Sequence, residues 1–557
     1  MDKKDIVSKI LDSYEEITIT GEQEDIVFFE LKGKEYGCWY PEIDQDVSSP
    51  FILVKNDVEY DYPHILPTSV PIDKNLKNKY RYVCLQENDS TIAFLQSIEE
   101  KLIDTIERLL HLLSLSDLEC EEEFQKEFLF YWNDMADKSG IARVYLNQNR
   151  EFQKLNSYRS NDGKIRFVAH GISLNDQSTK VNGEKKWKHL PELPVFYIPI
   201  TDKRRVLPPT RDKKWKAEDI LKIVCGKQFN RISHESYIKL GQEKVKTKHV
   251  GLVFEIEINE NYIDFTVIVG FKSAKNDTLL NKLKHEIMEV MPIMSRRADY
   301  YHLCRQIGNE TMLLNKKVLV VGAGSLGSYV ARELVKAGIK TLTIYDSESL
   351  VEENLLRHTV DGFWVGYSKT AGLKYELEQI HPEIHVTAVG KDIDKNSIIT
   401  EMEKADLILF TVGSSTVQWK LNKVLKNEKC KAKVVYAWLE AGGENSHILA
   451  IDYDKPGCFE CLYTDEYGTL TNNKANYNSE EDLDNYKIRN GCGGTRVAYG
   501  NAVLLRTTAV LLEVVRDLFE NPEAPNRLVD ITQTSVQDKR NSFIERKCRC
   551  CGDEIHK

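Results

Sequence analysis

The sequence lacks the features that direct a chain to a membrane or to nucleic acid. No apolar run approaches the about 20 residues that a membrane-spanning helix requires. The N-terminal segment carries acidic residues throughout and has no long apolar stretch, so the pattern of a secretory signal is missing. Basic residues are not in excess: 76 Lys and Arg stand against 86 Asp and Glu, and the net charge of −10 argues against binding nucleic acid along the whole chain. We therefore expect a cytoplasmic protein without a membrane or nucleic-acid partner.

Internal repeats and long low-complexity tracts are also missing from the 557 residues. This length is too great for one hydrophobic core, and at roughly 150 residues per domain three or four domains are expected. The twelve cysteines are not expected to form a disulfide framework in a reducing compartment, which leaves metal binding, nucleophilic chemistry and packing as their roles. Five lie in apolar or helical patterns and are predicted packing residues: Cys38, Cys120, Cys225, Cys304 and Cys430.

Changes in the sequence pattern predict three domains. Residues 1–138 combine aromatic and β-branched strand segments with later helices, which is typical of an α+β domain. Residues 139–293 are rich in strand-like segments, including a hairpin that turns at Asn259–Asn261, and form a β-rich middle domain without a chemical motif. Residues 294–557 alternate apolar strands with amphipathic helices, which predicts an α/β fold with a doubly wound, mostly parallel sheet.

The third predicted domain opens with a glycine motif between a strand and a helix. Gly322, Gly324 and Gly327 form G-x-G-x-x-G, in which glycine allows a tight turn and lets a phosphate approach the helix N-terminus. Asp346 closes the next strand, where a carboxylate can bind ribose hydroxyls. Taken alone, the motif also fits a dehydrogenase or a tight turn without a ligand.

A polar and cationic trio follows this motif. Asn354 and Arg357 share one short segment, and Lys369 stands just before a helix. Alone, Arg357 fits a surface salt bridge and Lys369 a solvated helix start. A nicotinamide enzyme has no need of the three together, whereas a triphosphate does, because Arg357 and Lys369 can offset the charge that develops on its phosphates. We therefore favour an ATP site in which these two cations are catalytic.

Five cysteines form two tight clusters near the end of the chain. Cys458 and Cys461 lie in P-G-C-F-E-C, and Cys548, Cys550 and Cys551 lie in K-C-R-C-C-G. The C-x-x-C pairs Cys458/Cys461 and Cys548/Cys551 provide the four thiolates of a structural Zn²⁺ site. Cys550 could replace a neighbour as a ligand, and reduced surface thiols are the alternative. A closed site of this kind has no open position, so we assign it no catalysis.

The motifs GAGSLGS, YDSESLVEENLLRH and GYSK resemble the adenylation domain shared by ubiquitin-activating enzymes and the bacterial ThiF and MoeB proteins. The resemblance covers roughly residues 295–557 and implies ATP and Mg²⁺ as cofactors and a homodimer; the family often carries a zinc site at the same places. It also implies roles for five residues: the ribose would be held by Asp346, the phosphates by Asn354, Arg357 and Lys369, and a partner's ATP by Arg305.

One position departs from the family pattern. Gly413 and Ser414 stand where the family usually has an aspartate, often a partner of Mg²⁺. Asp406 or another acid would then have to substitute, or the phosphates and water would hold the metal. The departure leaves open a weakened adenylation activity.

Cys492 is the first candidate nucleophile. It lies between glycines and before a long apolar helix, with Arg489 and Arg496 nearby in sequence. A thiol in such surroundings should have a lowered pKa and more thiolate. The position resembles the loop cysteine of the activating family, which receives the acyl group as a thioester. A small residue at a tight turn is the alternative.

Cys84 is the second candidate. DYPHILPTSVP and YRYVCLQEND resemble the ubiquitin-conjugating domain, in its divergent prokaryotic form, over about residues 1–135. Tyr62, Pro63 and Pro67 resemble its proline segment, and Cys84 its reactive cysteine. The His-Pro-Asn tripeptide of eukaryotic members is absent, and His64 is either a polar substitute or a structural residue. A buried core cysteine is the alternative for Cys84.

The domain order resembles the fused activating and conjugating proteins of bacterial CBASS anti-phage operons. That resemblance implies that ATP adenylates the C-terminus of a cGAS-like nucleotide synthase. This C-terminus would then be passed through thioesters at Cys492 and Cys84 to a target amine. An isopeptidase is a possible further partner. Two alternatives remain open: an activating enzyme for another bacterial ubiquitin-like or sulfur-carrier protein, and a degenerate nucleotide-binding scaffold.

Overall fold

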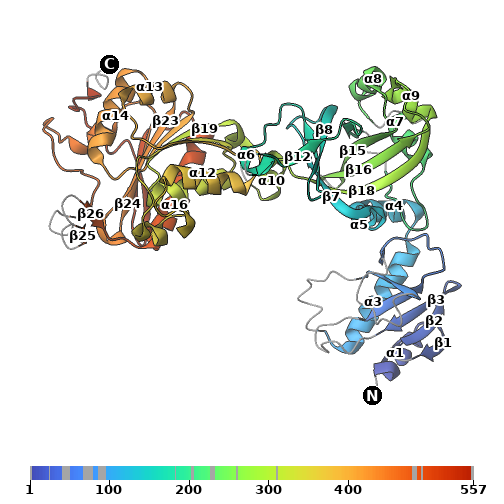
Figure 1. Cartoon of the computed structure of the whole chain (residues 1–557). Helices are drawn as coiled ribbons and strands as arrows, with labels where there is room; N and C mark the ends of the chain where they lie inside the picture. Colours follow the sequence, from blue (N-terminus) through green and yellow to red (C-terminus); the bar gives the residue numbers. More distant parts are fainter. Residues whose placement is uncertain are drawn as a thin grey trace. The chain divides into compact units, whose positions relative to one another are not determined.

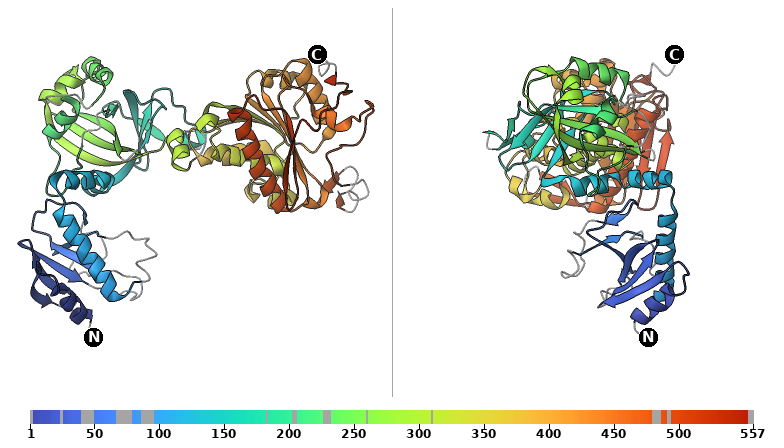
Figure 2. Two further views of the ribbon diagram at one scale, coloured as in Figure 1. Left: turned by 180° about the vertical axis from the view of Figure 1, so that it is seen from behind. Right: turned by 90° about the vertical axis from the view of Figure 1, so that its right-hand side faces the viewer.

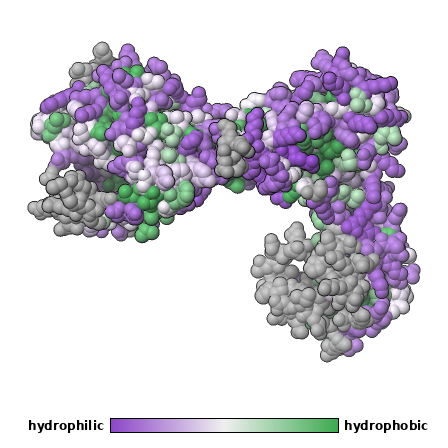
Figure 3. Space-filling model, in the orientation of Figure 1, coloured by the Kyte–Doolittle hydropathy of each residue, from purple (hydrophilic) through white to green (hydrophobic). Residues whose placement is uncertain are grey.

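The computed structural model separates the chain into two compact units (Figure 1). The first comprises residues 1–170 and 189–297, and the second comprises residues 171–188 and 298–557. The structure describes residues 3–23, 26–39, 50–66, 79–85, 96–181, 184–201, 206–225, 232–258, 261–308, 311–478, 486–490 and 494–552. Within these ranges, no helix is both long and apolar enough to cross a bilayer. Hydrophilic residues cover much of the face seen in Figure 3.

The first unit begins with an antiparallel sheet that helices cover on one face. The strand order is β1-β2-β3-β4-β6-β5, with β1 Thr18–Gln23, β2 Ile26–Leu31, β3 Lys34–Trp39, β4 Phe51–Lys55, β5 Ile65–Leu66 and β6 Tyr80–Val83. Helices α1 (Lys3–Leu11) and α3 (Ile98–Ser114) share the core of this sheet. Leu102, Ile106 and Leu109 recur at helical spacing on α3 and are all buried. This part of the chain is therefore α+β, as its sequence predicts.

Two short helices lead from this sheet to the next: α4 (Asp117–Lys126) and α5 (Phe128–Met135). Phe128 and Trp132 of α5 are buried in the core of the middle sheet, each with its ring centroid 4.7 Å from that of Phe265. Helix α5 therefore packs with the β-rich part of the unit, although it precedes the predicted domain boundary at residue 138.

The middle sheet closes on itself. Strand β9 pairs with both β7 and β8, so seven strands form a ring in the order β8-β13-β15-β16-β18-β7-β9. Their bounds are β7 Asp137–Tyr145, β8 Gln153–Ser160, β9 Ile165–Ala169, β13 Val195–Pro199, β15 His249–Ile258, β16 Asn261–Phe271 and β18 Ile287–Arg297. Strands β15 and β16 are antiparallel with Ile258 opposite Asn261, which confirms the predicted hairpin. Helices α7 (Ala217–Cys225), α8 (His234–Gln242) and α9 (Leu279–His285) share its core.

The second unit is a doubly wound sheet with helices on both faces (Figures 1 and 2). Five parallel strands are followed by three antiparallel ones in the order β21-β20-β19-β22-β23-β24-β27-β28. Their bounds are β19 Lys317–Val321, β20 Thr341–Tyr345, β21 His385–Val389, β22 Leu407–Phe410, β23 Lys433–Leu439, β24 Ser446–Ile451, β27 Arg527–Ile531 and β28 Val536–Arg540. This arrangement confirms the predicted α/β fold.

The helices of the second unit fall into two cores. Helices α11 (Ser325–Lys336), α12 (Lys369–Ile380) and α16 (Asn501–Glu520) contribute to one, and α13 (Lys395–Met402) and α14 (Ser415–Asn427) to the other. From β19 the chain runs outward to β20 and β21 on one side and to β22 and β23 on the other. The crevice at such a switch point is where open α/β sheets bind ligands.

Residues 171–188 pack with the second unit although they lie within the predicted middle domain. The side-chain amide of buried Asn175 donates to the backbone carbonyls of Glu378, His381 and Ile384 at 3.0, 3.1 and 2.9 Å. These carbonyls belong to the end of α12 and the turn that follows it. The two N–H groups of one asparagine amide thus serve carbonyls at and beyond the end of α12, where the helix supplies no further donors.

Candidate active site

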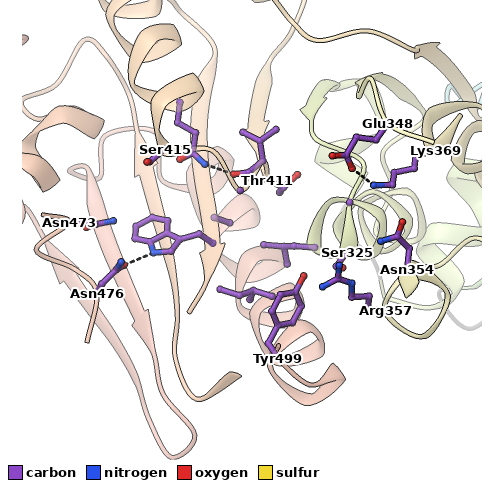
Figure 4. A pocket seen from close by; sticks show the side chains of 18 of the residues that line it. Ser325, Glu348, Asn354, Arg357, Lys369, Thr411, Ser415, Asn473, Asn476 and Tyr499 are labelled. Carbon is purple, nitrogen blue, oxygen red and sulfur yellow. Dashed lines mark hydrogen bonds and ion pairs between the residues drawn. The ribbon is translucent and has the colours of Figure 1, made fainter. Parts of the chain in front are cut away.

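A cavity of about 800 Å³ opens at the carboxyl ends of β19, β22 and β23, at the switch point of the sheet (Figure 4). One wall is polar and cationic and consists of Ser325, Glu348, Asn354, Arg357 and Lys369. Among the described residues, the opposite wall carries aromatic and amide side chains and no charged one: Trp438, Phe459, Tyr463, Asn473 and Asn476. The structure thus brings the polar trio predicted from the sequence to one wall of a single cavity.

The glycine motif forms the turn between β19 and α11. Gly322 has a φ of +100°, which an L side chain rarely adopts. A Cβ at Gly327 would lie 1.9 Å from the carbonyl oxygen of Gly322, so the helix approaches the turn more closely than any side chain allows. Gly324 caps α11 and lines the cavity, and its Cβ would meet no atom within 4 Å. The three glycines therefore build the turn and leave the helix N-terminus open to the cavity.

Asp346, the predicted ribose ligand, follows β20 and is hydrogen-bonded to the glycine turn. One carboxylate oxygen accepts from the backbone N–H of Ala323 at 2.7 Å, and the other from that of Glu348 at 2.8 Å. Burial raises the pKa of Asp346, against the effect of these two hydrogen bonds. The Asp346 carboxylate is therefore hydrogen-bonded to the backbone at the glycine turn and after β20. Glu348 is the described carboxylate that lines the cavity.

His358 was missed by sequence reasoning and holds the same turn from the other side. Its Nε2 lies 2.7 Å from the carbonyl oxygen of Ala323, and its Nδ1 accepts from the backbone N–H of Val360. Burial lowers its pKa to about 4, so the ring is neutral at physiological pH and Nε2 donates to Ala323. It is the last residue of the segment YDSESLVEENLLRH, but only its contact with the turn reveals its role.

The trio lies on short elements beside the turn. Asn354 and Arg357 belong to the 3-10 helix η2 (Glu352–Arg357), and Lys369 is the first residue of α12. Lys369 is 4% exposed and forms an ion pair with Glu348. The Arg357 guanidinium lies 5.4 Å from the ring centroid of Tyr499, and its buried Nε has no hydrogen-bond partner among the described residues. This donor fits an anion bound in the cavity.

The position of the missing aspartate is occupied by Gly413, which lines the cavity. Asp406 cannot substitute for it. That residue precedes β22 and accepts from the backbone N–H of Lys317, the first residue of β19, at 2.8 Å, so it lies at the amino ends of the strands, opposite the cavity. The hypothesis that Asp406 holds Mg²⁺ is therefore wrong. Glu348 remains as the cavity's carboxylate, and one carboxylate with substrate phosphates is a usual Mg²⁺ environment.

Arg305 lies on α10 (Tyr300–Gln306) and is exposed. Its guanidinium lies 5.9 Å from the ring centroid of Tyr301, and it does not line the cavity of its own chain. A role at the nucleotide would therefore require a second copy of the chain.

Four cysteines form a compact group that fits a metal ion. The sulfurs of Cys458, Cys461, Cys548 and Cys551 lie within 4.8 Å of one another, and all four residues are buried. Two of the sulfur pairs are 3.8 and 3.4 Å apart, close to the edge of about 3.8 Å of a tetrahedron with Zn–S bonds of 2.3 Å. Cys550 lies outside the group, and its sulfur accepts from the amide of Asn422 at 3.5 Å. The four-sulfur set predicted from the spacing is thus assembled.

Of the two candidate nucleophiles, the structure describes Cys84 but not Cys492. Cys492 lies outside the described residues, which include β25 (Lys487–Asn490) before it and β26 (Gly494–Val497) after it. Cys84 follows β6 and is half-buried, with its backbone N–H donating to the carbonyl of His64 at 2.7 Å. By contrast, Cys38 is fully buried, and burial raises its pKa to about 12, as suits a packing residue.

A buried charged cluster beside the uncharged wall was also missed. His447 on β24 is 0% exposed and lies between two carboxylates, with Nδ1 2.7 Å from Asp530 and Nε2 2.6 Å from Glu440. Although burial acts to lower it, these partners raise the pKa of His447. Burial acts to raise the pKa of both carboxyls, yet their hydrogen bonds with His447 and its charge hold those values below the ordinary ones.

The fold and this cavity define a nucleotide-binding, doubly wound domain. Residues 303–551 match the ThiF family, so the C-terminal part of the chain is similar to that family. The ATP-dependent ubiquitin transferase-like protein Cap2 of Pseudomonas aeruginosa (strain BWHPSA011 / Pa011) is 24% identical over 327 residues, which are 57% of this chain and 57% of that protein. The chain thus matches little more than half of this relative.

Further relatives cover other shares of the chain. The Cap2 protein of Escherichia coli (strain TW11681) is 23% identical over 77% of this chain and 76% of its own length. The molybdopterin-synthase adenylyltransferase of E. coli (strain K12) is 31% identical over 27% of this chain and 59% of its own length. Among solved structures, E. coli MccB with ATP has a TM-score of 0.34 at 20% identity and covers 43% of this chain and 68% of its own.

Proposed function

We propose that this protein uses ATP to activate the C-terminus of another protein and joins it to an amine. The carboxylate attacks the α-phosphate of ATP, forming an acyl-adenylate and releasing pyrophosphate. The thiolate of Cys492 then attacks the acyl carbon and AMP leaves, so that a thioester forms. The acyl group passes to the sulfur of Cys84 and finally to the amine, with each thiolate leaving as the next bond forms.

The observation that carries the proposal is the pairing of two unlike walls in one cavity. Arg357 and Lys369 face a triphosphate with two cations, and Asn354 adds an amide close to them. Charge builds up on the departing pyrophosphate, and preorganised cations inside a cavity stabilise that charge more than water does. In the free protein Lys369 is neutralised by Glu348, and phosphates would compete for it.

The opposite wall suits an extended peptide tail without charge. It exposes the rings of Trp438 and Tyr463 and the amides of Asn473 and Asn476 to the cavity. Amides can hydrogen-bond a peptide backbone, whereas a charged side chain would be buried there without a partner. A neutral tail lying on this wall would direct its terminal carboxylate toward the phosphates on the other side.

Two cofactors fit the residues present. Mg²⁺ would be held by Glu348 and by the phosphates, and it would neutralise part of their charge. Zn²⁺ would be held by the four cysteines, which leave no open position and therefore take no part in the reaction. Its effect would be structural, because it would tie the end of the chain to the η5 helix (Phe459–Tyr463).

Pyrophosphate exchange with a purified protein substrate tests the adenylation step. We expect exchange only when the substrate's C-terminus is free, and a loss of about 10²–10³-fold in Lys369→Ala. Lys395→Ala is the matched control, because Lys395 is also the first residue of a helix but is exposed. Equal rates for the two variants would contradict the assignment of Lys369.

Trapping the thioesters tests their order. Cys492→Ser should abolish the acyl–sulfur bond at both sites, whereas Cys84→Ala should leave a thioester at Cys492 and stop the transfer. Mass spectrometry of the cysteine peptides separates the two outcomes. Normal conjugation by Cys84→Ala would remove this residue from the scheme.

A homodimer is part of the proposal, with Arg305 reaching the nucleotide of the partner. Three large apolar side chains near the cavity support a covered surface: Leu356, Phe363 and Tyr367 are 87%, 78% and 60% exposed. Mixing Arg305→Ala with Lys369→Ala tests the arrangement. Activity should reappear in the mixture, because one cavity of a mixed dimer keeps both residues.

The protein substrate we propose is a cGAS-like nucleotide synthase in anti-phage defence, and the naming of several relatives as ATP-dependent ubiquitin transferase-like Cap2 supports it. A ubiquitin-like or sulfur-carrier protein is the second candidate, which the resemblance to molybdopterin-synthase adenylyltransferase favours. Exchange assays with each purified protein discriminate between them. Binding of ATP without any formation of AMP would instead indicate a degenerate nucleotide-binding scaffold. Gly413, at the position of the family's usual aspartate, is the reason to consider that alternative.

A further inference from the structure

We propose that His64 is the proton acceptor at Cys84 during transfer to the amine, and that Glu123 positions its imidazole. The inference rests on the proposed function, since it assigns a catalytic residue to the conjugating step. A lysine amine must lose a proton when it attacks a thioester, and the sequence lacks the His-Pro-Asn tripeptide of eukaryotic conjugating domains. The described residues around Cys84 contain a histidine and a carboxylate in contact.

His64 and Cys84 face each other at the end of a strand pair. Strands β5 and β6 are antiparallel with Ile65 opposite Val83, so the next pair is His64 and Cys84. The hydrogen bond from the Cys84 N–H to the His64 carbonyl, 2.7 Å long, continues the ladder to that pair. This hydrogen bond keeps the two residues adjacent, so that the imidazole can approach groups bound at the sulfur.

The backbone of His64 is held in an unusual conformation. Its φ is +69°, in the left-handed region that side chains other than glycine seldom occupy. Such a conformation persists only where surrounding contacts enforce it, and it is concentrated at functional sites. Here the His64 N–H donates to the hydroxyl of Tyr131 at 2.7 Å, and its carbonyl accepts from Cys84. Both hydrogen bonds fix the direction of the side chain.

The imidazole is oriented by an ionised carboxylate. Nε2 of His64 lies 3.3 Å from Oε2 of Glu123 on α4, and the two side chains are 23% and 27% exposed. Burial acts to raise the pKa of Glu123, but Lys126 and His64 hold it below its ordinary value. Glu123 therefore accepts the Nε2 proton and leaves the lone pair on Nδ1, where no described residue donates a hydrogen bond.

The middle sheet supports this arrangement. Tyr131, which holds His64, lies on α5, and the neighbouring Trp132 donates from Nε1 to the carbonyl of Ile293 on β18 at 3.2 Å. Because Phe128 and Trp132 are buried in the middle core, the helix that fixes His64 is itself fixed by the middle sheet. The β-rich part would thus help to position a catalytic group of the conjugating step.

In the proposed step, the amine nitrogen attacks the acyl carbon at Cys84 and forms the new C–N bond. The C–S bond breaks, and its electron pair leaves with the Cys84 sulfur as thiolate. The amine proton moves to Nδ1 of His64, and Nε2 keeps its hydrogen bond to Glu123. The titratable and charged groups around the ring are Glu123 with Lys126 on α4, Tyr131 on α5 and Cys84 after β6.

The test uses the full chain carrying Cys492→Ser, with Cys84 acylated by N-acetylglycine thioester and discharged by free lysine. Mass spectrometry of the Cys84 peptide follows both reactions. We expect His64→Gln to discharge about 10²-fold more slowly than the parent chain, while Cys84 is acylated at the same rate in both. Glu123→Gln should lose about tenfold in discharge with acylation of Cys84 unchanged, and Glu123→Asp should recover part of that loss. His111→Gln and Glu122→Gln, both exposed, are the matched controls.

A second variant separates catalysis from folding. Glycine adopts the φ of His64 without strain, so His64→Gly should keep the backbone, and added imidazole should restore discharge. Wild-type discharge by His64→Gln, or a slow His64→Gly whose discharge imidazole does not restore, would overturn the role of His64 and leave the proposed function standing. A loaded Cys84 that no amine discharges even in the parent chain would refute both.

Discussion

The indole of Trp438 stacks on the buried imidazole of His447, with ring centroids 5.0 Å apart and planes inclined by 25°. A residue of the cavity wall therefore rests on a buried charged group. The same indole donates from Nε1 to the amide oxygen of Asn476, another wall residue, at 2.8 Å. Tyr477, the next residue, stacks on His447 as well, and its N–H donates to Glu440 at 2.9 Å. The cluster thus holds the wall to the sheet.

We expect His447→Gln to destabilise the second unit by about 3 kcal/mol, because Glu440 would stay buried without its cation, whereas Asp530 would keep its ion pair with Lys539. The raised pKa of His447 means that its contribution is complete below 6.5 and is lost as pH rises through the raised value. The pKa values of the two carboxyls are lowered, so their contributions to stability are complete above pH 4.5 for Glu440 and above pH 3.8 for Asp530. Both contributions are lost at lower pH.

The difference in unfolding free energy between the wild type and His447→Gln should therefore be greatest between pH 4.5 and 6.5. Chemical denaturation at a series of pH values measures it. His170→Gln, at an exposed histidine, should show no such dependence. A difference that does not fall above pH 6.5 would mean that the imidazole is not charged in the folded protein.

Sequence patterns were sufficient where neighbours in the chain act together. The glycine turn, the strand–helix alternation and the C-x-x-C pairs are local, so their spacing predicts the doubly wound sheet and the four-sulfur group. Contacts between distant segments could not be predicted in this way. Glu440, His447 and Asp530 meet only because β24 and β27 pair, and the spacing of residues in the sequence does not indicate that pairing. Asp406 shows the same limit, since only the strand direction reveals at which edge of the sheet a side chain lies.

The four-cysteine group predicts one Zn²⁺ per chain, measured by elemental analysis of the purified protein. Cys548→Ser should abolish the metal and lower the melting temperature, because the segment that carries it would separate from η5. Cys550→Ser is the matched control and should keep the full metal content, since its sulfur lies outside the group. Loss of zinc in Cys550→Ser alone would mean that this thiol is the true fourth ligand.

Asn175→Ala should destabilise the second unit by about 1–3 kcal/mol, because carbonyls at the end of α12 and in the following turn would lose their amide donor in a buried site. Limited proteolysis should then cut within residues 171–188 faster than in the wild type. Asn147→Ala removes one amide hydrogen bond at an exposed site and should leave both properties unchanged. An unaltered cleavage rate in Asn175→Ala would show that other contacts hold the segment.

Gly327→Ala and Gly324→Ala should separate the folding of the glycine turn from its use by a ligand. At Gly327 the new methyl would lie 1.9 Å from the Gly322 carbonyl and 2.6 Å from the Thr411 hydroxyl, so the turn must move. We expect a loss of at least about 1–3 kcal/mol and no nucleotide binding. At Gly324 the methyl meets no atom within 4 Å, so stability should be unchanged, whereas ATP binding should weaken because the residue lines the cavity. Calorimetry of unfolding and of ATP binding measures both effects. Full ATP affinity in a stable Gly324→Ala would place the phosphates away from the start of α11.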